Sequence, residues 1–169
     1  MQGIGYTTED RKNDGLFLDQ SVVANLTMII LYKLSKYGWL TKKEKEKAEE
    51  LRLSYRIATP SLKKQIKFLS GGNQQKVIIA RTMAEALKVI ILDEPTKGVD
   101  IGAKQEIFKL VRQLADSGIA VIFISSEIEE VIDVSNRVLI MRDGESILEL
   151  EGTKVTKRRV LEIILEETQ

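Results

Sequence analysis

The sequence of 169 residues contains no cysteine and no histidine. Without cysteine it can form neither a disulfide bond nor a thiolate metal site, which is compatible with a reducing compartment. Without histidine it lacks the commonest general base, the commonest transition-metal ligand and the usual pH switch. A cation bound here should therefore be a hard one that prefers oxygen ligands, such as Mg²⁺.

Strong net charge and long apolar runs are also absent. The net charge of +1 gives no global attraction to nucleic acid or to an anionic membrane. The longest apolar stretch, residues 22–34, contains Lys33 and falls short of the roughly 20 residues that span a bilayer. Residues 1–14 are polar and do not resemble a signal peptide. We expect a soluble protein that reaches a membrane only through a partner.

The spacing of apolar residues predicts strands that alternate with helices, which is typical of an α/β fold with a parallel sheet. Continuous apolar runs at 89–92, 119–124 and 138–141 predict strands buried on both faces. Asp143-Gly144 predicts a hairpin turn into a strand at 147–150. The remaining expected elements are a short strand at 3–6 and helices at 22–34, 41–53, 70–86, 101–116, 127–134 and 155–165.

Two short segments carry candidate chemistry. Ser70-Gly71-Gly72 offers a hydroxyl and accessible backbone N–H groups at a helix start, where anions bind. Asp93 and Glu94 end a predicted buried strand, where one carboxylate can hold Mg²⁺ and the other can orient an attacking water. Taken singly, each segment also fits a plain structural interpretation: an ordinary N-cap with a flexible turn, and an ordinary acidic loop.

Together these segments resemble the ATP-binding cassette of ABC transporters. Ser70 to Gly72 match the signature motif, Val89 to Asp93 the Walker B strand, Glu94 the catalytic-base position and Pro95 to Asp100 the D-loop. Three further features are similar to the second cassette of the fused ATPases that drive import of ribose, galactose and xylose: residues 5–12, Asn73 and residues 97–104.

The resemblance implies ATP and Mg²⁺ as cofactors, Asp93 as the metal ligand and Glu94 as the catalytic residue. It also implies a set of nucleotide-binding residues: Ser70, Gly71, Gly72, Gln74, Asp100, Glu9 and Ser126. The implied fold is a partial P-loop NTPase (RecA-like) parallel sheet with a helical signature subdomain. Its expected division is a helical subdomain at about 18–88, a core sheet at 1–17 and 89–154, and a C-terminal helix at 155–169.

The sequence departs from the family pattern at three places. It contains no G-x-x-x-x-G-K-[ST] motif, so the Walker A loop that cradles the phosphates of ATP is missing. Glu9 stands at the glutamine position of the Q-loop, and Ser126 stands at the switch-histidine position. In the family, each ATP lies between the Walker A loop of one cassette and the signature motif of another. The chain would therefore complete the site of a partner cassette and contribute little at its own.

Three functional hypotheses follow. The first is a partial ATPase subunit of a sugar importer, inactive alone, working at the inner face of the cell membrane with a second cassette and transmembrane permease subunits and without nucleic acid. The second is a regulatory or interaction module that docks on a transporter or cassette without hydrolysing ATP. The third, a DNA-maintenance ATPase, is disfavoured because residues 20–69 lack sustained heptads and the charge is mild.

The missing Walker A strand also has a structural consequence. In the resembled fold it lies between the strands that match residues 119–124 and 138–141. Those two strands should either pair with each other or expose apolar edges that recruit another chain, giving a homodimer.

Overall fold

The computed structural model describes residues 3–36, 39–40 and 42–166 of the chain. The predicted α/β architecture is confirmed, with three parallel strands in the order β1-β4-β5. These are β1 (Ile4–Thr7), β4 (Val89–Asp93) and β5 (Ala120–Ile124). The register pairs Tyr6 with Ile91 and Ile91 with Ile122, so side chains at these positions lie on one face of the sheet. The carboxyl ends of all three strands meet at one edge.

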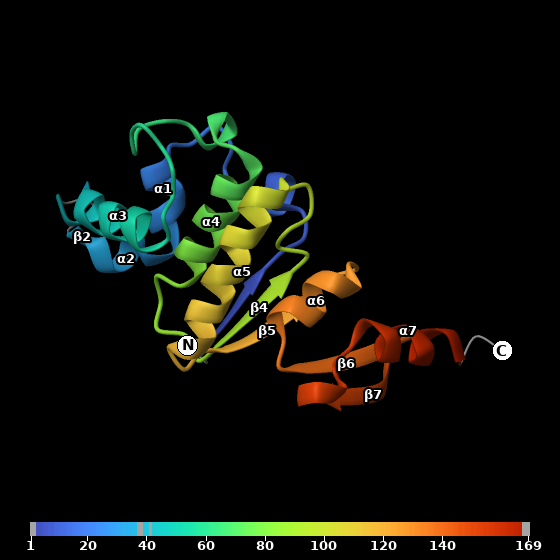
Figure 1. The fold of residues 1–169 in the computed structure, drawn as a ribbon. Helices are drawn as coiled ribbons and strands as arrows, with labels where there is room; N and C mark the ends of the chain where they lie inside the picture. Colours follow the sequence, from blue (N-terminus) through green and yellow to red (C-terminus); the bar gives the residue numbers. More distant parts are fainter. Residues whose placement is uncertain (1–2, 37–38, 41, 167–169) are drawn as a thin grey trace.

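Helices α4 (Gly71–Thr82) and α5 (Ile101–Asp116) cover the other face of this sheet, in front of the strands in Figure 1. The predicted apolar stripe of α5 packs there against β4 and α4, and the cluster they form is completely apolar. Its buried members are Ile79, Ile90, Leu92, Val99, Ile107, Leu110, Val111 and Leu114. Helix α4 ends four residues earlier than predicted because the chain must turn before β4. At this turn the amides of Lys88 and Val89 both donate to the Gly3 carbonyl oxygen.

The opposite face of the sheet is open, which corrects the prediction that these strands are buried on both faces. Along β4 only alternate residues, Ile90 and Leu92, are fully buried. We call the exposed apolar residues of this side the open sheet face; they are Ile4 and Tyr6, both 57% exposed, and Ile122 and Ile124, 49% and 45% exposed. The physical reason is that the helices in the described part of the chain pack on one side only.

A helical layer lies beside the sheet. The predicted helix at 22–34 is divided into α1 (Val22–Thr27), the 3₁₀ turn η2 (Met28–Ile30) and α2 (Leu31–Leu34). Helix α3 (Lys42–Ser54) agrees with the predicted charged helix, of which Thr41 lies outside the described residues. A separate apolar cluster joins α1, α3 and α4 around Leu26, Leu51 and Ile78. Short elements complete this part: η1 (Arg11–Gly15), β2 (Ser35–Lys36), β3 (Trp39–Leu40) and η3 (Ile66–Phe68).

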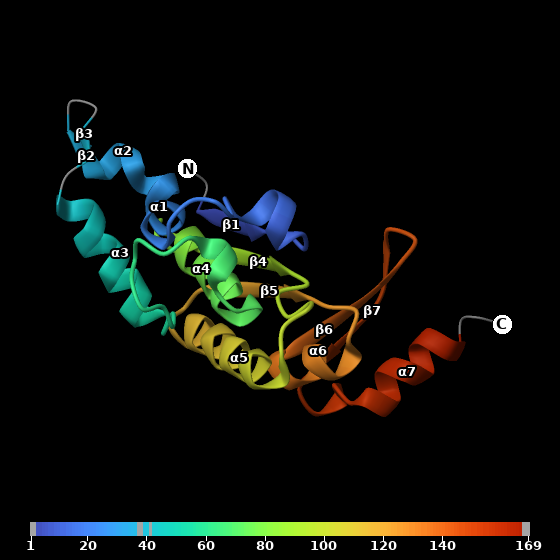
Figure 2. The same ribbon diagram turned by 90° about the horizontal axis from the view of Figure 1, so that it is seen from above.

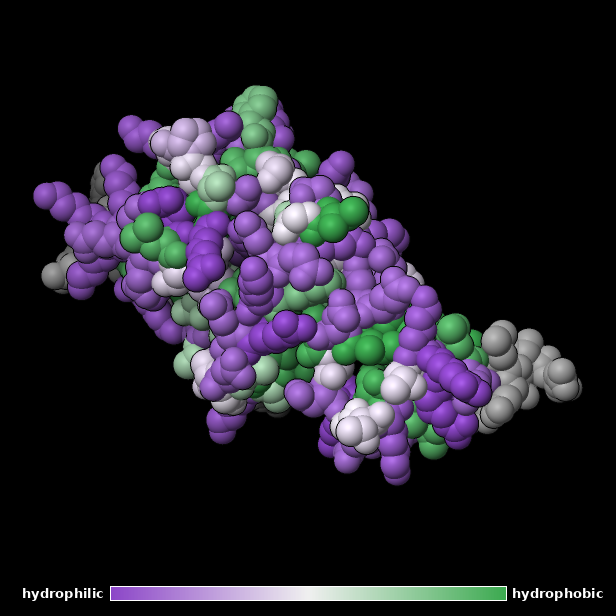
Figure 3. Space-filling view, viewed as in Figure 1, coloured by the Kyte–Doolittle hydropathy of each residue, from purple (hydrophilic) through white to green (hydrophobic). Residues whose placement is uncertain are grey.

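The C-terminal part forms a third unit at the end of the molecule away from α1–α3 (Figure 2). The predicted hairpin turn is confirmed: β6 (Arg137–Arg142) and β7 (Glu145–Glu151) are antiparallel. Together with α6 (Ile128–Val134) and α7 (Lys157–Glu166) they enclose a cluster of their own. Figure 3 shows hydrophobic surface gathered where α6 meets this hairpin, whereas the outer surfaces of α4 and α5 are mostly hydrophilic. The turn η4 (Gly152–Lys154) links β7 to α7.

Strand β6 does not behave as the third buried strand that the sequence predicts. It pairs with β7, and Leu139 and Met141 on its outer side are 53% and 61% exposed. Among the residues described here, β5 pairs only with β4 and β6 only with β7. The two strands therefore do not close the gap by pairing with each other. In the same part of the chain, no helix combines the length and apolar character needed to cross a bilayer.

Candidate functional site

Asp93 stands at the carboxyl end of β4, on the open side of the sheet. The Tyr6 hydroxyl donates a hydrogen bond to Asp93 Oδ2 at 2.8 Å. This hydrogen bond is the largest cause of a raised pKa at Tyr6, since the bond and the negative charge both hold the phenolic proton. Tyr6 therefore fixes the orientation of the Asp93 carboxylate and engages only one of its two oxygens.

Glu94 follows in an uncommon backbone conformation, with φ of +44°. For a residue with a Cβ this left-handed conformation is costly and persists where surrounding contacts enforce it. Here the Glu94 amide donates to the Ile124 carbonyl at 2.9 Å, and the Glu94 carboxylate accepts from the Ser126 amide at 2.6 Å. The structure thus brings together Glu94 and Ser126, two of the predicted site residues, at the ends of adjacent strands.

Ser70 is the N-cap of α4. Its hydroxyl oxygen accepts weakly from the Asn73 amide, at 3.5 Å, and more closely from the Asn73 side chain, at 2.9 Å. Ser70 is exposed and Gly71 is half-buried, so an anion can approach the start of this twelve-residue helix there, whereas Gly72 is buried. The predicted helix start at this serine is confirmed.

Close packing requires glycine at position 72 and favours it at position 71. A Cβ at Gly72 would lie 2.4 Å from Ala103 Cβ, so the lack of a side chain lets α4 approach α5. A Cβ at Gly71 would lie 2.9 Å from Arg11 Nη2. The sequence interpretation assigned both glycines to phosphate access, and the structure adds a packing role that spacing alone does not reveal.

Gln74 and Asp100 hold neighbouring backbone. Gln74 is 6% exposed, and its Nε2 donates to the carbonyl oxygens of Ile66 and Leu69, both at 3.2 Å. Its amide thereby shapes the loop that leads to Ser70. Asp100 is exposed and caps α5, accepting from the Ala103 amide at 3.0 Å.

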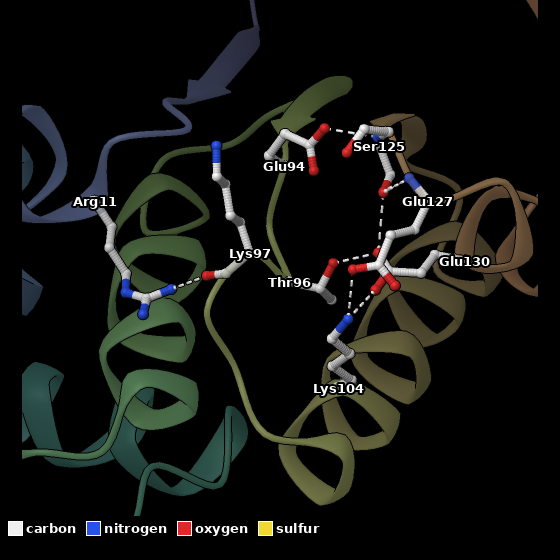
Figure 4. Close-up of polar contacts among 9 residues, drawn as sticks. Arg11, Glu94, Thr96, Lys97, Lys104, Ser125, Glu127 and Glu130 are labelled. Atoms are coloured by element: carbon white, nitrogen blue, oxygen red, sulfur yellow. Dashed lines mark hydrogen bonds and ion pairs between the residues drawn. The ribbon is translucent and has the colours of Figure 1, made fainter.

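Glu9 reaches the loop that follows β4. Its carboxylate forms an ion pair with the Lys97 ammonium, and the hydrogen bond in this pair is the main cause of a raised pKa at Lys97. Arg11, two residues further on, donates to the carbonyl oxygen of Lys97 (Figure 4) and to that of Gly98. The segment after β1 and the segment after β4 are thus tied by both side-chain and backbone contacts.

A buried carboxylate that the sequence interpretation missed lies on the other side of the same loop. Glu130 of α6 is 5% exposed and accepts hydrogen bonds from the hydroxyls of Thr96 and Ser125, while Lys104 of α5 pairs with it at 2.6 Å (Figure 4). Burial opposes ionisation of Glu130, but these three donors outweigh it and lower its pKa. Lys104 also pairs with the exposed Glu127 at 2.8 Å.

Within the described ranges, no three acidic side chains lie close enough to hold a metal ion together. Asp93 can supply an oxygen ligand, but the described acidic side chains do not form a complete metal site by themselves. This is a common arrangement for Mg²⁺, which keeps several waters and uses one or two carboxylates with substrate phosphates.

With this geometry in view, the comparisons with known proteins identify the family. The family model described as "ABC transporter" matches residues 2–97, more than half of the chain. The chain belongs to the ABC transporter family.

Two relatives show which branch of the family the chain is similar to. It is 42% identical over 162 residues to a ribose import ATP-binding protein of Bacillus licheniformis, covering 95% of this chain and 33% of that protein. It is 38% identical over 160 residues to a xylose import ATP-binding protein of Geobacillus kaustophilus, covering 94% of this chain and 32% of that protein. The chain thus spans about a third of the length of the relatives it matches.

A solved structure supports the fold independently. An ATP-binding cassette solved as a dimer in a post-hydrolysis state, bound to ADP and Pi, superposes with a TM-score of 0.72 at 23% identity. The match covers 89% of this chain and 63% of that one. The P-loop NTPase type of architecture predicted from the sequence is thereby confirmed.

Proposed function

We propose that this chain is part of the ATP-binding machinery of a sugar importer and completes the nucleotide site of a partner cassette. The observation that carries the proposal is the exposed, Ser70-capped start of α4, packed directly against the loop after β4. Sugar-import relatives at 42% and 38% identity, covering 95% and 94% of the chain, support the substrate class. The dimeric solved cassette, which binds ADP and Pi, supports assembly in pairs.

In this proposal Ser70, Gly71 and Gly72 offer the helix start to the terminal phosphate of ATP held by the partner, with Asp100 and the backbone that Gln74 supports beside it. The helix dipole and the free N–H groups favour an anion there. Glu9 takes the Q-loop position of the nucleotide site, and Ser126 takes the switch-histidine position. The helical, core-sheet and C-terminal regions remain the proposed units at 18–88, 1–17 with 89–154, and 155–169, although one hydrophobic cluster joins β6 and β7 to α7 across the boundary at 155.

At the chain's own site the residues fit Mg²⁺ and water better than they fit a whole nucleotide. Asp93 would hold the metal ion through the oxygen that Tyr6 leaves free. Glu94 would accept a proton from an attacking water, and its contact with the Ser126 amide fixes where it points. ATP with Mg²⁺ supplies the transferable phosphoryl group, but the printed sequence holds no Walker A loop to position it. We therefore propose that the chain does not hydrolyse ATP by itself.

The proposed partners are a second cassette and the transmembrane permease subunits of the importer. The chain would work on the cytoplasmic side of the cell membrane and meet the membrane only through the permease. In the absence of another cassette, the open sheet face and the edge of β5 that pairs with no described strand favour a homodimer, because exposed apolar strands recruit further strands.

The test uses the Bacillus licheniformis relative from which the 162 matching residues have been removed, which we call the shortened relative. Phosphate release from MgATP is measured for the shortened relative, for this chain, and for their mixture. We expect turnover only in the mixture. Ser70→Ala in this chain should lower that turnover by about tenfold or more, as expected for loss of a group that contacts developing charge.

The matched positive control is the relative's own 162-residue segment added to the shortened relative. If that segment restores turnover and this chain does not, the proposal is wrong. Binding of this chain to the shortened relative without turnover would then favour the regulatory or interaction module.

A further inference from the structure

Three segments that are distant in the sequence meet around the Arg11 guanidinium. Arg11 Nη1 donates to the Lys97 carbonyl oxygen at 2.5 Å, and Nη2 donates to the Gly98 carbonyl oxygen at 3.0 Å. The same Nη2 lies 2.9 Å from the position where Gly71 would carry a Cβ. Arg11, which belongs to the segment after β1, therefore lies against both the start of α4 and the loop after β4. Figure 4 shows its hydrogen bond to Lys97 of that loop.

The side chains at this junction suit the contacts that they make. A guanidinium has several N–H donors in one rigid plane and can hold two neighbouring carbonyls, whereas a lysine ammonium acts as a single flexible charge. Gly71 leaves room for the Arg11 guanidinium and for the Gly98 carbonyl group, since a Cβ at position 71 would also lie 3.1 Å from the Gly98 carbonyl oxygen. The ion pair between Glu9 and Lys97 holds the same loop through its side chain.

We propose that Arg11 is a positioning residue that fixes the loop after β4 against the Ser70-Gly71 turn. This inference rests on the proposed function, in which both segments face the nucleotide of a partner cassette. Arg11 itself does not touch the nucleotide. By holding two carbonyls of the loop, it sets the distance between the loop and the helix start, so its loss should impair turnover more than nucleotide binding.

Hydrogen exchange at the backbone amides of the loop after β4 can be measured on the isolated chain. The Lys97 amide donates to the Glu94 carbonyl and the Val99 amide to the Thr96 carbonyl, both at 3.1 Å. If Arg11 holds this loop, Arg11→Gln should speed hydrogen exchange at these two amides by about tenfold or more, because hydrogen bonds from a charged donor are lost. The amides of β4 and of the middle of α5 should exchange at unchanged rates.

The experiment compares Arg11→Gln and Arg11→Lys with Lys12→Gln, which removes a charge from the neighbouring exposed residue. Hydrogen exchange and the melting temperature are measured on each isolated chain, and kcat and KM for ATP on each mixture with the shortened relative. We expect both Arg11 variants to lower kcat about tenfold or more while KM changes less than about twofold. Lys12→Gln should match the unmodified chain.

Two results would overturn the inference. One is unchanged exchange at Lys97 and Val99 together with unchanged kcat in both Arg11 variants. The other is faster exchange throughout β4 and α5, which would make Arg11 a general stabiliser of the fold. If the unmodified chain fails to support turnover, the proposed function fails, and exchange at the two loop amides still decides whether Arg11 positions the loop.

Discussion

Replacing Glu130 by glutamine should destabilise the protein far more than the same change at Glu127. Both carboxylates pair with Lys104, at 2.6 and 2.8 Å, but the Glu130 side chain is 6% exposed and that of Glu127 is 59% exposed. Glu130 also accepts hydrogen bonds from Thr96 and Ser125. The two substitutions are a matched pair, because each removes one of the two carboxylate charges that pair with Lys104.

The expected magnitudes follow from burial. Breaking a fully buried ion pair by removing one partner costs about 3–5 kcal/mol. In the Glu130→Gln variant, Lys104 is 20% exposed and still pairs with Glu127, and the glutamine keeps one acceptor oxygen. We therefore expect a smaller cost, a fall of about 2 kcal/mol in the free energy of unfolding. An exposed pair contributes about 0–1 kcal/mol, so Glu127→Gln should cost less than about 1 kcal/mol. Urea unfolding followed by circular dichroism at pH 7 measures both.

The pH dependence of the free energy of unfolding gives a second test of the role of Glu130. The pKa of Glu130 is lowered from its ordinary value of 4.5 in the folded protein, so the unfolded chain takes up its proton at a higher pH than the folded one. The stabilisation is then fully present above about pH 4.5 and is lost as the pH falls through the lowered pKa. The difference between the unmodified chain and Glu130→Gln should shrink in that acid range. Equal costs for the two variants at pH 7, within about 0.5 kcal/mol, would refute the reasoning.

Three further predictions concern nucleotide and assembly. The isolated chain should release no phosphate from ATP above a Glu94→Gln control, since the sequence contains no Walker A loop, and steady release above that control would contradict this. Ser70→Ala should leave any nucleotide affinity of the isolated chain unchanged, as measured by calorimetry, because the serine serves a partner's site; a changed affinity would show that it serves its own. The isolated chain should sediment as a dimer at high concentration. Ile122→Lys on the open sheet face should shift the chain to a monomer, whereas Ile101→Lys, at an exposed position on α5, should not. A strictly monomeric unmodified chain would disprove association through the open sheet face.

The elements that position the site could be predicted from local patterns. Ser70 and Asp100 both precede helices and both act as N-caps in the structure. The apolar spacing of α5 and the apolar runs of β4 and β5 gave their positions within a residue or two. These features depend on short-range chemistry, which a single sequence contains.

The open sheet face could not be predicted in the same way. A continuous apolar run such as residues 89–92 is typical of a strand covered on both sides, but it cannot show whether both covering layers are present. In the described part of the chain only α4 and α5 lie on the sheet, so Ile122 and Ile124 remain exposed although their strand reads as fully buried.

The buried polar contacts were missed for a different reason. Glu130 lies among Glu127, Glu129 and Asp133, and composition alone assigns such a run to a solvated helix face. Its partner Thr96 is 34 residues away in the sequence, so only the fold brings the two together. Arg11 likewise stands in a polar loop, 86 residues from the Lys97 carbonyl that it holds.

The loop after β4 is fixed from two sides, and this distinguishes the proposed role from that of a passive docking module. On one side Arg11 holds its backbone, and on the other Thr96 donates to the buried Glu130. Between these contacts Glu94 keeps a costly left-handed backbone and a carboxylate fixed on the Ser126 amide. Strained backbone of this kind is frequent at functional sites. The local order is what a chain needs if it must present a helix start and an acidic group at set positions to a nucleotide whose main contacts lie on another cassette.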